Sequence, residues 1–262
     1  MLERVLYPLF RRVDFRGKGR LRGVLPVRES GEADATFPGG VRLRLDLRES
    51  LQRDFLFGLF DHRELSLLRE HLRGGDFVDV GAHVGLYALT AAKAGARQVL
   101  ALEPNPDARR QLLRNVELNE CSGVVVRDRA AAGEPGRAVL HVPSTPDPSF
   151  SSLAGGRFAE GEPLEVEVTT VDAEVEELRL RPTVVKIDVE GGELGVVEGM
   201  RRTVREHRPV VLVEVNAESA PAVARTLEGY SGFRVGRRLE PLASGRGLFN
   251  ALFLPQPPVS PR

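Results

Sequence analysis

Apolar residues in the middle of the chain follow a pattern that alternates between strands and helices. The segment Asp76–Val80 is a short apolar run with β-branched residues, bounded upstream by Gly74-Gly75, and it predicts a buried strand. The segment from Val84 to Ala94 is rich in helix formers with apolar side chains on most faces, and it predicts a helix. The chain therefore passes sharply from a strand into a helix, with Gly81 and Gly85 at the turn.

The same alternation continues toward the C-terminus. Strands are predicted at Arg97–Leu102, Val124–Val126 and Pro209–Val215, and a helix at Pro106–Asn119. The stretch Val184–Glu193 predicts a further strand that passes into a helix, which continues to about Arg202. Successive strand–helix units favour a parallel sheet with helices on both faces. We therefore expect an α/β fold with a doubly wound, mostly parallel sheet.

Segments outside these units predict a single domain over 1–262. The N-terminal part, 1–75, contains an alternating strand at Val41–Leu47 and a helical segment at Phe55–Leu72 that breaks near Asp61-His62. We expect it to form a strand and helix cover over a core that spans 76–254, with a tail at 255–262.

An insertion is predicted at 133–170 of this core. It has strands at Arg137–Val142 and Leu164–Thr170 around a long loop rich in proline, serine and glycine, 143–163. Long loops of this kind often bind ligands, so we interpret it as either a substrate-facing element or a disordered bulge.

Composition narrows the class of protein. The 262 residues carry 37 Lys+Arg and 37 Asp+Glu, so no overall field attracts nucleic acid. The single cysteine, Cys121, excludes an intramolecular disulfide and indicates a reducing, cytoplasmic setting. No apolar segment approaches the ~20 residues that span a bilayer. The basic segment Arg11–Arg22 is either a solvated face or an anion-binding arm, and the oligomeric state is not encoded in any pattern we recognise.

The charge at the glycine turn limits the classes of ligand that could bind there. A dinucleotide fingerprint reads G-x-G-x-x-G, whereas here Gly81 and Gly85 are separated by three residues that include His83. Asp79 beside the turn would repel a diphosphate but could hold an ammonium or lie near a sulfonium. S-adenosylmethionine (SAM) carries both cations and no phosphate. The stretch resembles the first motif of class I SAM-dependent methyltransferases; the alternative is a glycine-rich turn in another doubly wound protein.

Acids follow the next two strands. Glu103 lies at the carboxyl end of the second strand, where it can accept hydrogen bonds from both ribose hydroxyls of a nucleoside. NAD-binding enzymes place an acid there too, so Glu103 indicates a ribose and does not distinguish the cofactors. Asp128, at the end of the third strand, is either near the adenine ring or a surface acid.

A second cluster of acids follows the fourth strand, at Asp188, Glu190 and Glu193. Crowded carboxylates repel one another, which raises the pKa of at least one of them. Asp188 is our first candidate for a catalytic base, with Glu190 and Glu193 next, although Glu193 could simply stabilise the start of a helix. Lys186 shares a strand face with Asp188 and either keeps that carboxylate ionised or pairs with it structurally.

A metal site is a further candidate at this edge. Asp188, Glu214 and Asn216 offer oxygen ligands from two adjacent strand ends, as Mg²⁺ requires. The five histidines show no metal-ligand spacing.

Three stretches together carry a family resemblance. The segments 79–85, 103–106 and 186–193, which include Lys-Ile-Asp-Val-Glu-Gly, resemble in order and spacing the FkbM family of methyltransferases. The resemblance covers roughly 41–254 and implies a seven-stranded sheet whose last two strands, Phe233–Leu239 and Leu248–Leu254, form an antiparallel hairpin. It also implies SAM-dependent O-methylation of hydroxyls on macrolides, sugars and glycolipid-type products. His83 departs from the usual asparagine, and Gly192 from a common alanine.

The sequence therefore predicts a SAM-dependent O-methyltransferase with a small-molecule hydroxyl acceptor and with Mg²⁺ as a candidate second cofactor. The alternatives are a SAM- or nucleoside-binding partner protein without activity and an NAD-dependent oxidoreductase. The predicted cofactor-binding residues are Asp79, Gly81, His83, Gly85, Glu103 and Asp128, and the predicted catalytic residues are Asp188, Glu190 and Lys186.

Overall fold

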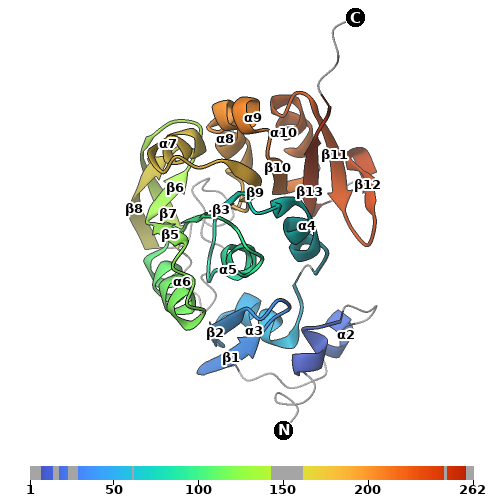
Figure 1. The fold of residues 1–262 in the computed structure, drawn as a ribbon. Helices are drawn as coiled ribbons and strands as arrows, with labels where there is room; N and C mark the ends of the chain where they lie inside the picture. Colours follow the sequence, from blue (N-terminus) through green and yellow to red (C-terminus); the bar gives the residue numbers. More distant parts are fainter. Residues whose placement is uncertain are drawn as a thin grey trace, which may run out of the picture.

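A large mixed sheet organises the computed structural model, which describes residues 7–13, 18–22, 29–60, 62–142, 162–244 and 247–257 (Figure 1). The strands, in spatial order, are β12 (Leu239–Pro241), β11 (Tyr230–Val235), β13 (Leu248–Pro255), β10 (Val210–Asn216), β9 (Pro182–Ile187), β3 (Asp76–Val80), β4 (Val99–Leu102) and β5 (Val124–Arg127). The run from β10 to β5 is parallel, and β13 lies antiparallel between β10 and β11.

The expectation of seven strands was wrong, because this sheet has eight. β11 and β13 are antiparallel neighbours, as expected for the last pair. The predicted strand Phe233–Leu239, however, ends at Val235, and the chain reverses so that β12 pairs antiparallel with β11 as an extra edge strand. A backbone hydrogen bond from the N–H of Gly236 to the carbonyl oxygen of Arg238, 3.2 Å long, closes this reversal, which is a local turn inside the segment that we predicted to be one strand.

Helices cover both faces of the sheet, as the alternating pattern predicted. One face packs against α4 (His62–Leu72), α5 (Leu86–Lys93) and α6 (Pro106–Leu118), and the other against α7 (Val171–Glu177), α8 (Glu193–Glu198) and α10 (Ala220–Thr226). Neighbouring strand residues alternate between the two cores, since Phe77 faces the first and Val78 the second. The predicted helix toward Arg202 is divided at 199–200, where α8 ends and α9 (Arg201–His207) begins.

The N-terminal part forms its own layer beside α5 (Figure 1). It consists of α2 (Lys18–Arg22), a hairpin of β1 (Glu32–Thr36) and β2 (Arg42–Asp46), and α3 (Ser50–Phe57), which the chain connects to α4. Leu43, Leu45 and Phe57 share a core with Val84, which precedes α5, and with Leu89, which lies in α5. This third core ties the N-terminal layer to the sheet through the helix that follows the glycine turn.

The predicted insertion contains a small separate sheet. Its strands are β6 (Arg129–Ala131), β8 (Glu162–Thr169) and β7 (Gly136–Val142), in that order. The loop that we expected to face the substrate, 143–163, lies almost wholly outside the described residues, as does most of the expected tail at 255–262. A short 3₁₀ helix, η3 (Leu242–Ser244), completes the described elements. Among these described helices, none has the length and apolar character needed to cross a membrane.

Candidate functional site

A cavity of about 260 Å³ opens at the carboxyl ends of β3, β4, β9 and β10. Its wall brings together five of the predicted site residues and one predicted metal ligand: Gly81, His83, Glu103, Asp188, Glu190 and Glu214. Ligands of open α/β sheets bind at this edge, because the loops that follow parallel strands meet there. Asp79, Gly85, Asp128, Lys186 and Asn216 are not in the cavity wall.

The turn between β3 and α5 has three residues with positive φ. A different structural requirement explains the residue type at each position. Gly81 has φ 81° and lines the cavity. Gly85 has φ 93° and faces the interior, where an added Cβ would lie 2.4 Å from the Cδ1 atom of Leu112 in α6. Gly85 therefore allows two helices to pack closely and does not contact the space for a ligand.

His83 is the third of these residues, with φ 48°. Asparagine, aspartate and histidine tolerate this left-handed conformation better than most residues, which explains how histidine can occupy the position. Its Nε2 atom lies 3.1 Å from Oε2 of Glu49, the residue before α3. Burial lowers the pKa of His83, but the hydrogen bond and charge of Glu49, together with the charges of Glu103 and Asp188, raise the pKa overall. The N-terminal layer thus reaches the cavity through Glu49.

Glu103 connects the ends of two strands. Its Oε2 atom accepts a hydrogen bond from the backbone N–H of His83 at 2.7 Å, and Oε1 accepts one from Asn105 at 2.9 Å. Burial raises its pKa, although His83 and the two amides act in the opposite direction. Because a carboxylate can accept further hydrogen bonds, Glu103 can hold both loops and still face a hydroxyl in the cavity.

Asp79 lies behind the turn rather than beside a ligand. It is only 1% exposed and occupies the position next to Lys186 across β3 and β9. Its Oδ2 atom has no hydrogen-bond partner among the described residues. Burial, which outweighs the attraction of Lys186, raises the pKa of Asp79 to about 7. Asp79 is therefore not part of the cavity wall, and its contact with a cofactor ammonium stays a prediction.

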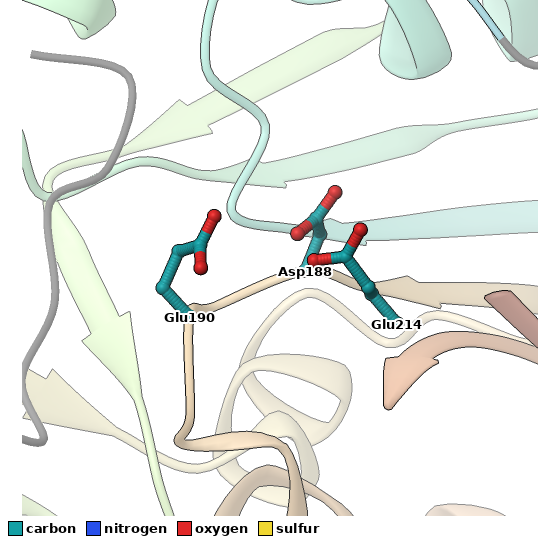
Figure 2. Close-up of side chains that lie close together, drawn as sticks. All are labelled: Asp188, Glu190 and Glu214. Atoms are coloured by element: carbon teal, nitrogen blue, oxygen red, sulfur yellow. The ribbon is translucent and has the colours of Figure 1, made fainter. Parts of the chain in front are cut away.

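Three carboxyl groups meet on the other side of the cavity. Figure 2 shows Asp188 and Glu190, which follow β9, and Glu214 of β10 directed toward a common space. One oxygen atom from each lies within 4.8 Å of the others. Burial and the charge of Asp188 raise the pKa of Glu190 to about 7 and that of Glu214 to about 8. The group therefore favours a positive charge placed between its members.

Lys186 supports this group from below the cavity wall. Its side chain is 2% exposed, and its Nζ atom lies 3.1 Å from Oδ2 of Asp188 and 5.1 Å above the ring of Tyr87. Burial acts to lower the pKa of Lys186, but the charges of Asp188 and Glu64 outweigh it and raise the pKa. The ammonium is therefore charged and bonded to the carboxylate that we expect to act as base.

Three further residues named in the sequence analysis lie outside the cavity wall. Asn216 is exposed, and its Oδ1 atom accepts hydrogen bonds from the backbone N–H groups of Glu218 at 2.9 Å and Ser219 at 2.8 Å, so it stabilises the turn before α10. Asp128 is an exposed residue between β5 and β6. Glu193 is buried at the start of α8 and accepts a hydrogen bond from Gly191 at 2.7 Å, an arrangement that fits stabilisation of the helix start.

Sequence reasoning missed several residues of the site. Glu49 and Leu51 come from the N-terminal layer, and Arg129 comes from β6 of the small sheet. Arg129 is bonded to Glu174 at 2.8 Å, so its charge is already compensated. In the described part of the cavity wall, four carboxyl groups therefore face this one paired arginine and His83. The wall fits a ligand that carries positive charge, as the sulfonium and ammonium of SAM do, and disfavours a diphosphate.

Comparisons with known proteins agree with this chemistry. Residues 79–235 match the model of the methyltransferase FkbM domain. The hexuronic acid methyltransferase AglP of Haloferax volcanii is 31% identical over 160 residues, which are 60% of this chain and 63% of that protein. The ribosomal protein L11 methyltransferase of Chloroflexus aurantiacus is 39% identical over 83 residues, which are 29% of this chain and 25% of that protein. The chain thus spans less than two thirds of either relative.

A solved structure is also similar at low identity. The methyltransferase FkbM from Methylobacillus flagellatus shares 18% identity, with a TM-score of 0.45, over 77% of this chain and 52% of that one. This distant likeness adds nothing to the assignment, which depends on the family model. Since that model matches more than half of the 262 residues, the chain belongs to the FkbM methyltransferase family.

Proposed function

We propose that the protein is a SAM-dependent O-methyltransferase that methylates a hydroxyl of a sugar, polyketide or glycolipid-type small molecule. The observation that carries the proposal is the single cavity that joins the turn at Gly81, the acid Glu103 and the carboxyl groups of Asp188, Glu190 and Glu214. Membership of the FkbM family supports methyl transfer. Similarity to the hexuronic acid methyltransferase AglP supports a sugar as acceptor.

The residues of the cavity divide into two parts. Gly81 and Glu103, at the ends of β3 and β4, would hold the nucleoside, with Glu103 accepting hydrogen bonds from ribose hydroxyls. Asp188, Glu190 and Glu214, at the ends of β9 and β10, would surround the positively charged end. When bound, SAM supplies a methyl group that is already activated on a sulfonium.

Asp188 is the proposed proton acceptor. A hydroxyl must lose its proton as its oxygen bonds to carbon, and a base within hydrogen-bond reach assists that loss. Lys186, 3.1 Å from Oδ2, orients the carboxylate that takes the proton. Glu190 and Glu214 disfavour anions in the same space. Most of the rate can then come from alignment of the hydroxyl with the methyl group.

Calorimetric titration with SAM tests the cofactor. Wild type is expected to bind SAM, and Glu103→Ala is expected to lose at least tenfold in affinity because it loses the ribose contact and the bond to His83. Asp107→Asn, an exposed acid on α6, serves as the control and should bind like wild type. A folded wild type that does not bind SAM would refute the proposal.

A second measurement separates an enzyme from a binding protein. Release of S-adenosylhomocysteine is followed with SAM and a panel of sugars that includes hexuronic acids, with and without a chelator. Turnover of an acceptor supports the enzyme, and a loss of turnover on chelation that Mg²⁺ restores would add a metal to the site. Titration with NADH, followed by its fluorescence, tests the oxidoreductase alternative.

A further inference from the structure

Glu64 is a buried acid of α4 that lies outside the segment matched by the family model. It is 0% exposed, and Oε2 accepts a hydrogen bond from the hydroxyl of Tyr87, which belongs to α5. Both helices cover the face of the sheet on which the side chain of Lys186 is buried, since α4 and α5 contact each other and α4 contacts β9. An acid in this setting is costly unless it is hydrogen-bonded and faces a positive charge.

The ammonium of Lys186 is a positive charge that acts on Glu64. The two groups interact electrostatically, and Tyr87 lies between their elements with its ring 5.1 Å from Nζ. The face of an aromatic ring attracts a cation within about 6 Å. Glu64 holds the phenol that carries this ring, so one acid acts on the ammonium both directly and through Tyr87.

The position of the Lys186 ammonium needs this support because the side chain is long and several acids attract it. Asp79, Asp188 and Glu214 all attract the ammonium from the sheet side, and Asp188 accepts a hydrogen bond from it at 3.1 Å. A lysine side chain loses much rotamer freedom when it is held in one place. The ring of Tyr87 from α5 and the charge of Glu64 from α4 both act on this ammonium.

We propose that Glu64, acting with Tyr87, is a positioning residue for the methyl-transfer site that holds the Lys186 ammonium against Asp188. The role rests on the proposed function of Asp188. The N-terminal part, 1–75, is then more than a cover over the site, because its helix α4 supplies a group on which the geometry of the base depends.

The composition of the chain makes a direct test practical. Lysine occurs only at positions 18, 93 and 186, so selective labelling of lysine side chains gives three NMR signals, and Lys186→Met identifies the third. Glu64→Gln is expected to shift the Lys186 signal of the cofactor-free protein and to leave the Lys93 signal in place. Glu70→Gln, an exposed acid on the same helix, is the matched control and should shift neither.

Tyr87→Phe is the second variant, since it keeps the ring and removes the hydrogen bond to Glu64. It is expected to shift the Lys186 signal less than Glu64→Gln does, and it provides the test if Glu64→Gln fails to fold. In wild type, SAM should shift the Lys186 signal through Asp188, and this response should fall at least twofold in Glu64→Gln.

Two results would overturn the inference. One is a Lys186 signal that coincides with wild type in both folded variants; the other is a lowered melting temperature without a shift of that signal, which would make Glu64 merely structural. Failure of wild type to bind SAM would refute the proposed function instead. The Lys186 signal of the cofactor-free protein would still decide whether Glu64 positions the ammonium.

Discussion

A Cβ atom added to Gly81 would lie 1.8 Å from the backbone carbonyl oxygen of Asp188. The turn after β3 and the segment that follows β9 are therefore in direct contact, and no side chain fits between them. Gly81 also has φ 81°, which L-residues rarely adopt. One glycine thus sets both the shape of the turn and the position of the proposed base.

Gly81→Ala is predicted to lose both stability and SAM binding. The clash and the backbone strain together should lower the free energy of unfolding by about 3 kcal/mol or more, and abolish SAM binding. Gly74→Ala, at the other end of β3, is the control, because Gly74 has φ 71° and nothing within 4 Å of its added Cβ. Chemical denaturation and calorimetry measure both effects; equal losses in the two variants would contradict the role of the Asp188 contact.

His83 should be replaceable by asparagine but not by a β-branched residue. Its φ of 48° is tolerated by asparagine and strained for valine. We expect His83→Asn to bind SAM within a few-fold of wild type, although it loses the bond to Glu49. His83→Val should lose about 1–2 kcal/mol of unfolding free energy more than His83→Asn. Similar unfolding curves for the two variants would show that the left-handed conformation is not required.

Asp188→Asn should separate binding from turnover. The amide keeps the size of the side chain but cannot accept the proton, so the rate of methyl transfer should fall about 10²–10⁴-fold once an acceptor is known. SAM affinity should fall less than tenfold, because Glu190 and Glu214 remain. Unchanged turnover would show that the acids at this edge are structural, and Asp107→Asn again serves as the unaffected control.

The burial of Asp79 predicts a pH-dependent stability. Its pKa is raised from 3.8 to about 7, so the folded state holds a proton that the unfolded state releases between these values. This group therefore makes the free energy of unfolding decrease as pH rises through that window, and the loss is complete above about pH 7. Asp79→Asn removes the ionisation, and the difference in stability between the variant and wild type should grow in favour of the variant over the same window.

Urea unfolding at several pH values measures this difference. Each unit of pKa difference corresponds to about 1.4 kcal/mol, so the change should exceed 1 kcal/mol. Asp128→Asn is an exposed control that should show no such trend. A constant difference between Asp79→Asn and wild type across the window would show that Asp79 does not titrate there.

Much of this protein can be predicted from the sequence because its parallel strands are short, apolar and followed by acids. Buried strands show as apolar runs, and parallel strands place their carboxyl ends at one edge of a sheet. These two facts are enough to bring Gly81, Glu103 and Asp188 to one place. The hairpin reversal that adds β12 is not encoded in this way, because it depends on a local turn.

The tertiary structure alone decided which acids face the cavity and which lie behind it. Asp79 and Asp188 look equivalent as acids near strand ends, yet one is buried beside Lys186 while the other lines the cavity. Glu49 and Glu64 carry no local signal, since their partners are His83, Tyr87 and Lys186 on other elements. Periodicity determines which face of an element is buried, but contacts between elements that are distant in sequence determine which charges meet.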